Sequence, residues 1–404
     1  MRFFNLDLHI GVIGDIKQIF NALGHEVTQW SLSAHSWVLD RRIDKVDVVN
    51  QHTWRDINPE MCKAFYDRYK SELEQYDAFI VTHTPCFAML YERWNKPIIC
   101  VASTRYEAPF TDSAEAWAHF NSFLRNQIDS GMLIPLANNK YDSAYAEYFT
   151  QRQWKVIPSL CNYTSAPYTG ELRQSLYVSK FELPRTIPNL VSKGDYFKRR
   201  ILQRVAVKLG IATRKRGYSW RDIAAFRSAV VVPYNASIMS IFEMYASGIP
   251  MLFPSLKYAV ELYGESRRKG IFSELSYNQV RGLPSGSVLP CDSMDPNNYD
   301  DVATMEYWIE KSDFYDSENM KHLTYFDSFD EIDSLLRTVD FEEVHRNMIE
   351  HHRVRSANAY AAWKTVLNAL SCRHSKGQPS LQVAASVEEA STDHGLVDLS
   401  IGML

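Results

Sequence analysis

Short apolar runs alternate with stretches of helical spacing along the first part of the chain. The runs are rich in β-branched and aromatic residues and predict buried strands at 1–10, 26–32, 78–81, 97–102, 132–137 and 154–157. Apolar residues at helical spacing predict amphipathic helices between most of these strands, at 12–23, 60–75, 114–128 and 143–151. Strands that alternate with helices are typical of parallel βαβ units with right-handed crossovers.

The alternation starts again after 158–170, a segment rich in Pro, Ser, Thr and Tyr that we interpret as a domain boundary. The second series has predicted strands at 175–180, 229–232 and 251–253 and predicted helices at 195–209 and 237–246. Clusters of Gly, Pro, Ser and Asn predict long loops at 265–300, and the chain is predicted to be helical from there onwards. The predicted fold class is therefore α/β, with two Rossmann-like parallel-sheet domains that face a cleft. We expect domains at 1–165 and 171–340, closing helices at 341–370 and a mobile tail at 371–404.

In the stretch 230–255, VVVPYNASIMSIFEMYASGIPMLFPS, a small polar turn joins a buried strand to a helix. Such a turn lies at the ligand crevice of an open α/β sheet, where backbone N–H groups and the helix dipole attract anions such as phosphate. Glu243 follows Ser240 by three residues, so it lies on the same helix face and can accept hydrogen bonds from a ribose diol. The alternative is local: Asn235 or Ser237 caps the helix, and Ser240 and Glu243 form a capping box.

The pattern PYNxSxMSxFExYxxGIPxLFP in this stretch resembles the donor-binding βαβ unit of GT-B glycosyltransferases. The segment LHIGVIGDIKQIFNALGHEVTQWSLS resembles the opening of GT-B acceptor domains, with a strand, a glycine turn, a helix and a step into the second strand. The segment FEEVHRNMIEHHRVRSANAYAAWKTVLNAL resembles the helices that end such chains, one of which crosses back to the first domain. The chain is also similar to exostosin-like and algal-virus glycosyltransferases.

The resemblance implies an enzyme that moves a sugar from a UDP- or GDP-linked donor to a hydroxyl group of a glycan acceptor. It implies that the first domain binds the acceptor, that the polar turn holds the donor diphosphate and that Glu243 holds the ribose. It also implies that no cofactor and no essential metal takes part. The second glutamate of the family's donor motif is missing, because Met251 stands eight residues after Glu243. This departure favours inversion at the anomeric carbon.

Three predicted strand ends of the first half carry polar side chains at the crevice, around His9, His83 and Glu107. Glycosyl transfer needs a group that takes the proton of the acceptor hydroxyl, and histidine or a carboxylate does this near neutral pH. A structural role is the alternative for each of the three. We predict His9, His83 or Glu107 as the catalytic base and Asp7 and Arg105 as acceptor-binding residues.

The second half supplies the predicted donor-binding residues. Lys180 ends the first predicted strand of that half, so it faces the same cleft as a cation for the diphosphate. Tyr218 either stacks on the nucleobase or packs in the core. The predicted donor-binding set is Lys180, Tyr218, Tyr234, Asn235, Ser237, Ser240 and Glu243.

Composition limits the classes of partner, cofactor and cellular location that we expect. A net charge of −4 and a pI of about 6.3 give no global basic field, so we expect no nucleic-acid partner. Six scattered cysteines without a CxxC pair indicate reduced thiols in a cytoplasmic protein and no structural zinc. We expect no signal peptide and no transmembrane segment, because acids interrupt the apolar N-terminus and no apolar run is long enough. Acidic pairs at 292–295 and 300–301 match a metal-binding DxD motif only loosely, so we expect no metal site.

Two other functions fit the same pattern. A nucleotide-sugar epimerase of similar fold needs no acceptor, and a non-catalytic nucleotide- or glycan-binding protein binds without turnover. The chain contains no Ser-His-Asp order, P-loop lysine motif or HExxH motif. The segment 11–14, GVIG, lacks the GxGxxG spacing of a dinucleotide site.

Overall fold

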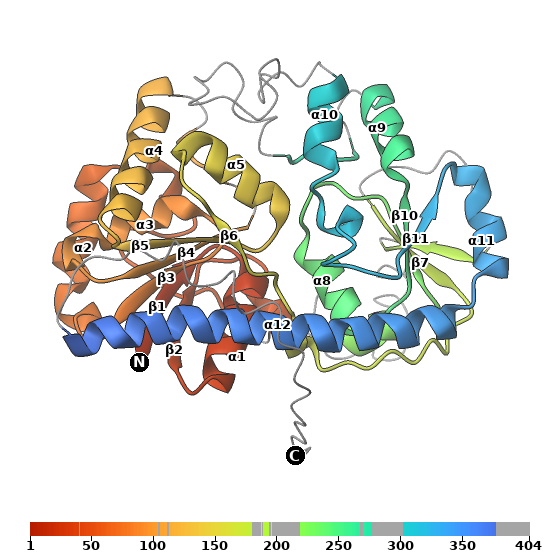
Figure 1. The fold of residues 1–404 in the computed structure, drawn as a ribbon, viewed down its shortest axis with the longest axis horizontal. Helices are drawn as coiled ribbons and strands as arrows, with labels where there is room; N and C mark the ends of the chain where they lie inside the picture. Colours follow the sequence, from red (N-terminus) through yellow and green to blue (C-terminus); the bar gives the residue numbers. More distant parts are fainter. Residues whose placement is uncertain are drawn as a thin grey trace, which may run out of the picture.

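The structure is a computed structural model, and it describes residues 1–39, 41–103, 106–110, 113–179, 187, 189–193, 195, 219–266, 270–275 and 302–376. Within these ranges the chain forms two α/β domains, each built on one sheet, with a long helix below both (Figure 1). In both sheets every pairing is parallel, which confirms the predicted fold class.

The first sheet has six strands in the order β2-β1-β3-β4-β5-β6. Their bounds lie close to the predicted ones: β1 Arg2–Asp7, β2 Glu26–Ser31, β3 Ala78–Val81, β4 Ile98–Ala102, β5 Leu133–Ala137 and β6 Lys155–Val156. The central strands are buried on both faces, as the continuous apolar runs at 78–81 and 98–102 require. The apolar pattern therefore predicts this sheet well.

Helices cover both faces of the first sheet (Figure 1). Helix α1 (Ile10–Ala22) packs on one face, and the other carries α2 (Pro59–Leu73), α3 (Ala88–Tyr91), α4 (Ala114–Asp129) and α5 (Lys140–Thr150). Three of these helices begin at side-chain caps: Asn58, Ser113 and Asn139 each accept a hydrogen bond from a backbone N–H of the first turn. These caps explain why the helices start directly after their loops.

The second sheet has five strands in the order β11-β10-β9-β7-β8. The strands are β7 Ser175–Val178, β8 Leu190–Ser192, β9 Ala229–Val231, β10 Met251–Pro254 and β11 Thr324–Phe326, and the helices are α7 Trp220–Ala224, α8 Met239–Ala246, α9 Leu256–Glu265, α10 Val302–Ile309 and α11 Ile332–Thr338. Strand β8 was not predicted. The prediction of an all-helical chain after residue 301 was wrong at β11, a three-residue strand with a partly exposed side. Most of the helix predicted at 195–209 lies outside the described residues.

The chain ends in α12 (Phe341–Lys376), one helix of 36 residues that runs beneath both domains (Figure 1). Its first half packs on the second domain, where His345 Nδ1 lies 2.8 Å from the Gly248 carbonyl oxygen. Its second half packs on the first domain, where the rings of Trp363 and Phe20 lie 5.1 Å apart. The predicted crossing is therefore confirmed, with a single helix that continues past 370. The rest of the predicted tail lies outside the described residues.

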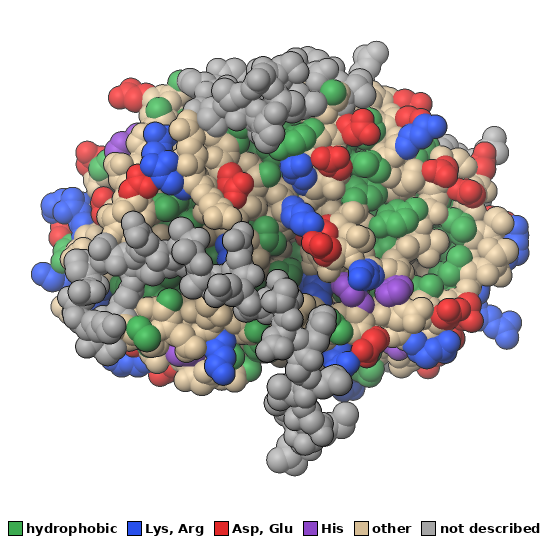
Figure 2. Space-filling model, viewed as in Figure 1, with side chains coloured by type: hydrophobic (Ala, Val, Ile, Leu, Met, Phe, Trp, Pro, Cys, Tyr) green, Lys and Arg blue, Asp and Glu red, His purple; other side chains and the backbone are tan. Residues whose placement is uncertain are grey.

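The surface of the described residues mixes both signs of charge. Figure 2 shows acidic and basic side chains interspersed over both domains on the face it draws. In the part of the chain that the structure covers, no helix has the length and apolar character to cross a membrane.

Arg355 of α12 joins the two domains. Its Nη2 donates to the Ser159 carbonyl of the first domain, and its Nε donates to Asn319 Oδ1 of the second at 2.7 Å. Its Nη1 lies 3.3 Å from His352 Nδ1 on the same helix. Only 4% of the Arg355 surface is exposed, so these bonds replace the water that the guanidinium loses.

Aromatic rings and carboxylates complete the surroundings of Arg355. Its guanidinium carbon lies 5.4 Å from the Phe242 ring centroid and 5.8 Å from that of Tyr245. Burial lowers the pKa of Arg355, and the negative charges of Asp313 and Asp15 oppose that change. The guanidinium thus holds contacts from both domains and from α12.

We predict that Arg355→Ala lowers the free energy of unfolding by about 3–5 kcal/mol, because it leaves buried acceptors and carboxylates without their cation. Arg353→Ala is the matched control, since Arg353 is an exposed residue of the same helix that pairs with Glu350 at 2.8 Å. That change should cost less than about 0.5 kcal/mol. Urea unfolding of both variants measures the difference. Equal losses in the two variants would contradict the bridging role of Arg355.

Candidate functional site

Both sheets reverse their strand order at the same point. In the first sheet β1 lies between β2 and β3, and in the second sheet β7 lies between β8 and β9. At such a point the loops after two neighbouring strands run in opposite directions. They leave a crevice at the carboxyl ends of these strands, where α/β sheets bind ligands. The ends of β1 and β3, and of β7 and β9, are therefore the first places to search for a site.

Asp7 ends β1, and its carboxylate ties the ends of β1 and β3 together. Its Oδ2 accepts hydrogen bonds from Thr82 N and Thr82 Oγ1, both at 2.8 Å, and from His83 N at 2.9 Å. Its Oδ1 accepts from Leu8 N at 2.6 Å. Burial raises the pKa of Asp7, and these donors oppose the rise. Both carboxylate oxygens accept hydrogen bonds from the protein, so Asp7 positions the loop of His83, and its acceptor-binding role stays a prediction.

His9 and His83 face one another at this switch point. Their ring centroids lie 5.1 Å apart with the planes inclined by 36°, and both residues are half-buried. His9 is the residue before α1 and makes no side-chain capping bond. His83 Nδ1 lies 3.0 Å from Thr84 Oγ1, which orients the ring. The structure thus brings together two of the three predicted candidates for the base.

Glu107 lies on the same edge of the sheet, beyond the end of β4, but it is buried with 2% of its surface exposed. Its charge acts on Tyr145, a fully buried residue of α5. Ser103 links the ends of β4 and β3 through a 3.1 Å bond from its Oγ to the Thr82 carbonyl. A base must reach the substrate hydroxyl, so the half-buried His9 and His83 fit that role better than Glu107 does.

The polar turn after β9 is held from inside the second domain. Asn235 Oδ1 accepts a hydrogen bond from Ala236 N at 2.8 Å, and the Ala236 carbonyl accepts one from Asp313 N at 3.1 Å. Ser237 lies beside the buried Asp313 carboxylate. Burial raises the pKa of Asp313 well above its usual value, while the Ser237 hydroxyl opposes the rise. Asn235 and Ser237 are therefore parts of a buried polar turn.

Helix α8 begins at Met239, later than predicted. Ile238 is the residue before it and makes no side-chain capping bond. The capping box that was the alternative for Ser240 and Glu243 is therefore not formed. Glu243 needs another explanation.

Glu243 is buried at the boundary between the domains, with 5% of its surface exposed. Its Oε1 accepts a hydrogen bond from Tyr163 Oη. Burial raises the pKa of Glu243 to about 8, although the Tyr163 bond and the charge of Lys193 lower it; the charge of Asp15 adds to the rise. A carboxyl group of this kind exchanges protons near neutral pH.

Tyr163 belongs to a short 3-10 helix, Asn162–Thr164, between the two domains, and it packs on the start of α1. A Cβ atom on Gly11 would lie 3.0 Å from Tyr163 Oη, and one on Gly14 would lie 3.8 Å from Tyr163 Cδ1. Both glycines lie inside α1, so the predicted glycine turn was wrong. The missing side chain of Gly11 makes room for the Tyr163 hydroxyl group, whereas a Cβ atom on Gly14 would clash with Leu39 Cδ1 at 2.6 Å.

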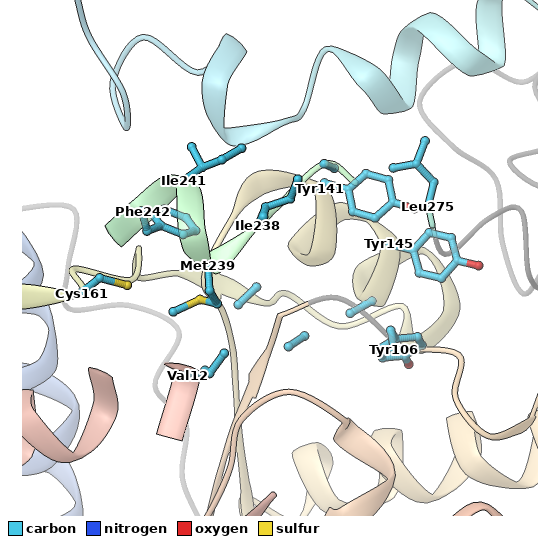
Figure 3. Close-up of a cluster of buried hydrophobic side chains, with 14 of the residues drawn as sticks. Val12, Tyr106, Tyr141, Tyr145, Cys161, Ile238, Met239, Ile241, Phe242 and Leu275 are labelled. Atoms are coloured by element: carbon cyan, nitrogen blue, oxygen red, sulfur yellow. The ribbon is translucent and has the colours of Figure 1, made fainter. Parts of the chain in front are cut away.

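Apolar side chains from both domains fill the boundary where the two carboxyl edges meet (Figure 3). Val12 of α1 and Met239 of α8 belong to one buried cluster there. Tyr141 and Tyr145 of α5 each have a ring centroid 5.4 Å from that of Trp308 on α10. In the described part of this boundary, packed side chains from both domains therefore meet.

A shallow pocket of about 450 Å³ lies elsewhere, between α1 and the start of β2. Its lining residues are Lys17, Asn21, Glu26, Val27, Thr28, Gln29 and Arg41. It lies at the amino edge of the first sheet, away from His9 and His83.

Other predicted site residues have less to support them. Tyr234 and Ser240 are partly exposed at the polar turn, whereas Arg105, Lys180 and Tyr218 lie outside the described residues. Within the described ranges, no group of three or more His, Cys, Asp or Glu side chains is placed to hold a metal ion. The acidic pairs at 292–295 and 300–301 also lie outside those ranges, and the absence of a metal stays a prediction.

Sequence reasoning missed Tyr163, Asp313 and Arg355. Tyr163 stands in an Asn-Tyr-Thr triplet that matches a glycosylation sequon, and nothing near it in the sequence indicates a partner 80 residues away. Arg355 is one of several basic residues of a polar helix. Only the three-dimensional arrangement of the domains distinguishes these residues from neighbouring residues of the same type.

Comparisons with known proteins find likeness in structure only. No protein-family model matches the chain, and no curated protein matches its sequence. Similar solved structures include a glycotransferase of kitacinnamycin (12% identity, 91% of this chain and 98% of that chain, TM-score 0.41) and the glycosyltransferase SnogD from Streptomyces nogalater (13%, 91% and 99%, TM-score 0.42). The glycosyltransferase VinC in complex with DTDP is another (11%, 87% and 95%, TM-score 0.37). Scores at this level carry no argument about function. The similarity to exostosin-like and algal-virus enzymes stays a prediction.

We predict that Glu243→Gln makes the protein less sensitive to alkaline conditions. With a pKa of about 8 in the folded state and about 4.3 when unfolded, Glu243 holds its proton better in the folded protein. Its contribution to stability is fully present below the unfolded pKa and is lost as pH rises through the folded pKa. The variant should gain stability over the wild type between about pH 5 and pH 8, by at most about 1.4 kcal/mol per pH unit.

Urea unfolding of both proteins at pH 5, 6.5 and 8 measures this difference. A difference that stays constant across the three pH values would show that Glu243 keeps an ordinary pKa in the folded protein.

Proposed function

We propose that this protein is a glycosyltransferase that moves a sugar from a nucleotide-sugar donor to a hydroxyl group of a glycan acceptor. One observation supports this function most: two parallel sheets with the same reversal of strand order direct their carboxyl edges at one boundary. One edge carries the imidazoles of His9 and His83, and the other carries a small polar turn followed by the carboxyl group of Glu243. A transfer reaction needs such a meeting of two sites, one for each substrate.

On the donor side, the diphosphate would lie over the start of α8. Backbone N–H groups and the helix dipole favour an anion there, and the hydroxyl groups of Ser237 and Ser240 add donors. Glu243 would accept hydrogen bonds from the ribose diol. Lys180 and Tyr218 keep their proposed roles toward the diphosphate and the nucleobase, with UDP or GDP as the nucleotide.

On the acceptor side, His9 or His83 would take the proton of the attacking hydroxyl. Thr84 orients the ring of His83, and Asp7 fixes the loop that carries it. Attack by the deprotonated oxygen on the face opposite the diphosphate inverts the anomeric carbon. We propose that this step uses neither a metal nor a cofactor, because the α8 N-terminus and nearby cations can stabilise the leaving diphosphate.

We predict that the protein binds at least one of UDP, GDP, ADP and TDP, and that Glu243→Gln weakens this binding ten- to a hundredfold. The reason is the loss of a hydrogen bond to the ionised carboxylate, which contributes about 1.5–3 kcal/mol; the titration is therefore made at about pH 9, above the Glu243 pKa of about 8. Calorimetric titration measures both affinities. Glu261→Gln on the exposed face of α9 is the matched control and should bind as the wild type does. No binding of any of the four nucleotides would refute the proposed function.

A second prediction concerns the base. His9→Gln or His83→Gln should lower the rate of sugar transfer by about two to four orders of magnitude while donor binding stays nearly intact, since a general base contributes about that much. His119→Gln, at an exposed position of α4, is the control. Product analysis by NMR completes the test. A retained anomeric configuration would contradict inversion, an altered free sugar nucleotide would indicate an epimerase, and binding without any turnover would indicate a binding protein.

A further inference from the structure

Tyr163 donates a hydrogen bond to the carboxyl group of Glu243, which the proposed function assigns to the ribose. Its hydroxyl donates to Glu243 Oε1, the side chain of a residue that is almost fully buried. A ribose diol would offer Glu243 the same kind of donor, a hydroxyl group, from the same boundary. The two donors therefore compete for one acceptor.

Three helices hold the segment that carries Tyr163. Its hydroxyl group lies beside Gly11 of α1, and Asn162 Oδ1 lies 2.8 Å from His352 Nε2 of α12. Thr164 Oγ1 lies 3.4 Å from Ser247 Oγ at the end of α8. The segment is thus a junction of the first domain, the second domain and the crossing helix.

The backbone on both sides of this segment is strained. Cys161 has φ +57° and Ser165 has φ +48°, so two residues with side chains adopt the left-handed region that favours glycine. Neither residue lies in a repeating element that would require this conformation. Such strain persists only where the surroundings hold it, and it is released when those contacts open.

We infer that Tyr163 is an autoinhibitory latch: its bond to Glu243 keeps the two domains closed over the donor site, and a nucleotide binds only when this bond breaks. The inference rests on the proposed function for the identity of the competing ligand. It explains why the described boundary is packed with apolar side chains although both sheets direct their ligand edges at it. Breaking the bond and separating Val12 from Met239 exposes the polar turn and the pair of His9 and His83 together.

The test removes only the hydroxyl. Tyr163→Phe keeps the ring beside Gly14 of α1, so the protein should fold, and a melting curve checks this. We expect this variant to bind nucleoside diphosphate about tenfold more tightly than the wild type, because the bound nucleotide no longer displaces a hydrogen bond to a carboxyl group. Tyr168→Phe is the matched control. Tyr168 is another tyrosine of the linking segment, and its hydroxyl donates to the Arg227 carbonyl at 2.8 Å.

Titration of UDP, GDP, ADP and TDP into the three proteins gives outcomes that separate the two proposals. Tighter binding by Tyr163→Phe alone supports the latch. Unchanged or weaker binding by Tyr163→Phe, with clear binding by the wild type, overturns the latch and leaves the proposed function standing. No binding by any of the three proteins overturns the proposed function and, with it, competition between Tyr163 and a nucleotide.

Amide hydrogen exchange provides a measurement that needs no ligand. Without nucleotide, residues 159–166 should exchange faster in Tyr163→Phe than in the wild type and the Tyr168→Phe control, because the segment loses its anchor. Faster exchange in Tyr163→Phe without nucleotide binding by any of the proteins would show that the hydroxyl anchors the segment, but it would overturn the competition with a nucleotide. Equal exchange in all three proteins would show that the hydroxyl does not hold the segment and would overturn the latch.

Discussion

The buried guanidinium of Arg355 is the constraint on which the arrangement of the two domains depends. A charge with only 4% of its residue surface exposed is costly unless every donor finds a partner. Its partners come from the loop after β6, the loop before β11 and α12 itself. If any of these three segments moves away, one buried nitrogen of the guanidinium loses its partner. One side chain therefore bonds to both domains and to the crossing helix at once.

This alignment places the candidate site inside the contact between the domains. The switch-point loops that would bind substrates also carry the side chains that close the boundary: Val12 and Met239 pack there, and Tyr163 bonds to Glu243. Substrate binding and domain opening then become one equilibrium, because a ligand that needs the exposed loops binds only the open form.

Local patterns in the sequence predict the helices and strands. They do not predict which residues pair across the boundary between the domains. The first sheet follows from contiguous apolar runs, whereas β8 and β11 have three residues each and are partly exposed, so no periodic signal marks them. The sequence predicts His9 and His83 on one edge because parallel strands end together, and the structure confirms that they meet. Tyr163 and Glu243 are 80 residues apart and belong to different domains. Only the contact between the domains, set by α12, brings them together.

Hydrogen exchange of the wild-type protein with and without a bound nucleoside diphosphate tests the central claim most directly. Our account predicts that the nucleotide changes exchange in four segments that meet at the boundary: 7–15, 82–87, 161–165 and 234–243. Protection should rise at the polar turn, and exchange should become faster in the segment of Tyr163 as it leaves Glu243. Changes confined to the pocket between α1 and β2, around Lys17 and Arg41, would contradict a donor site between the two sheets.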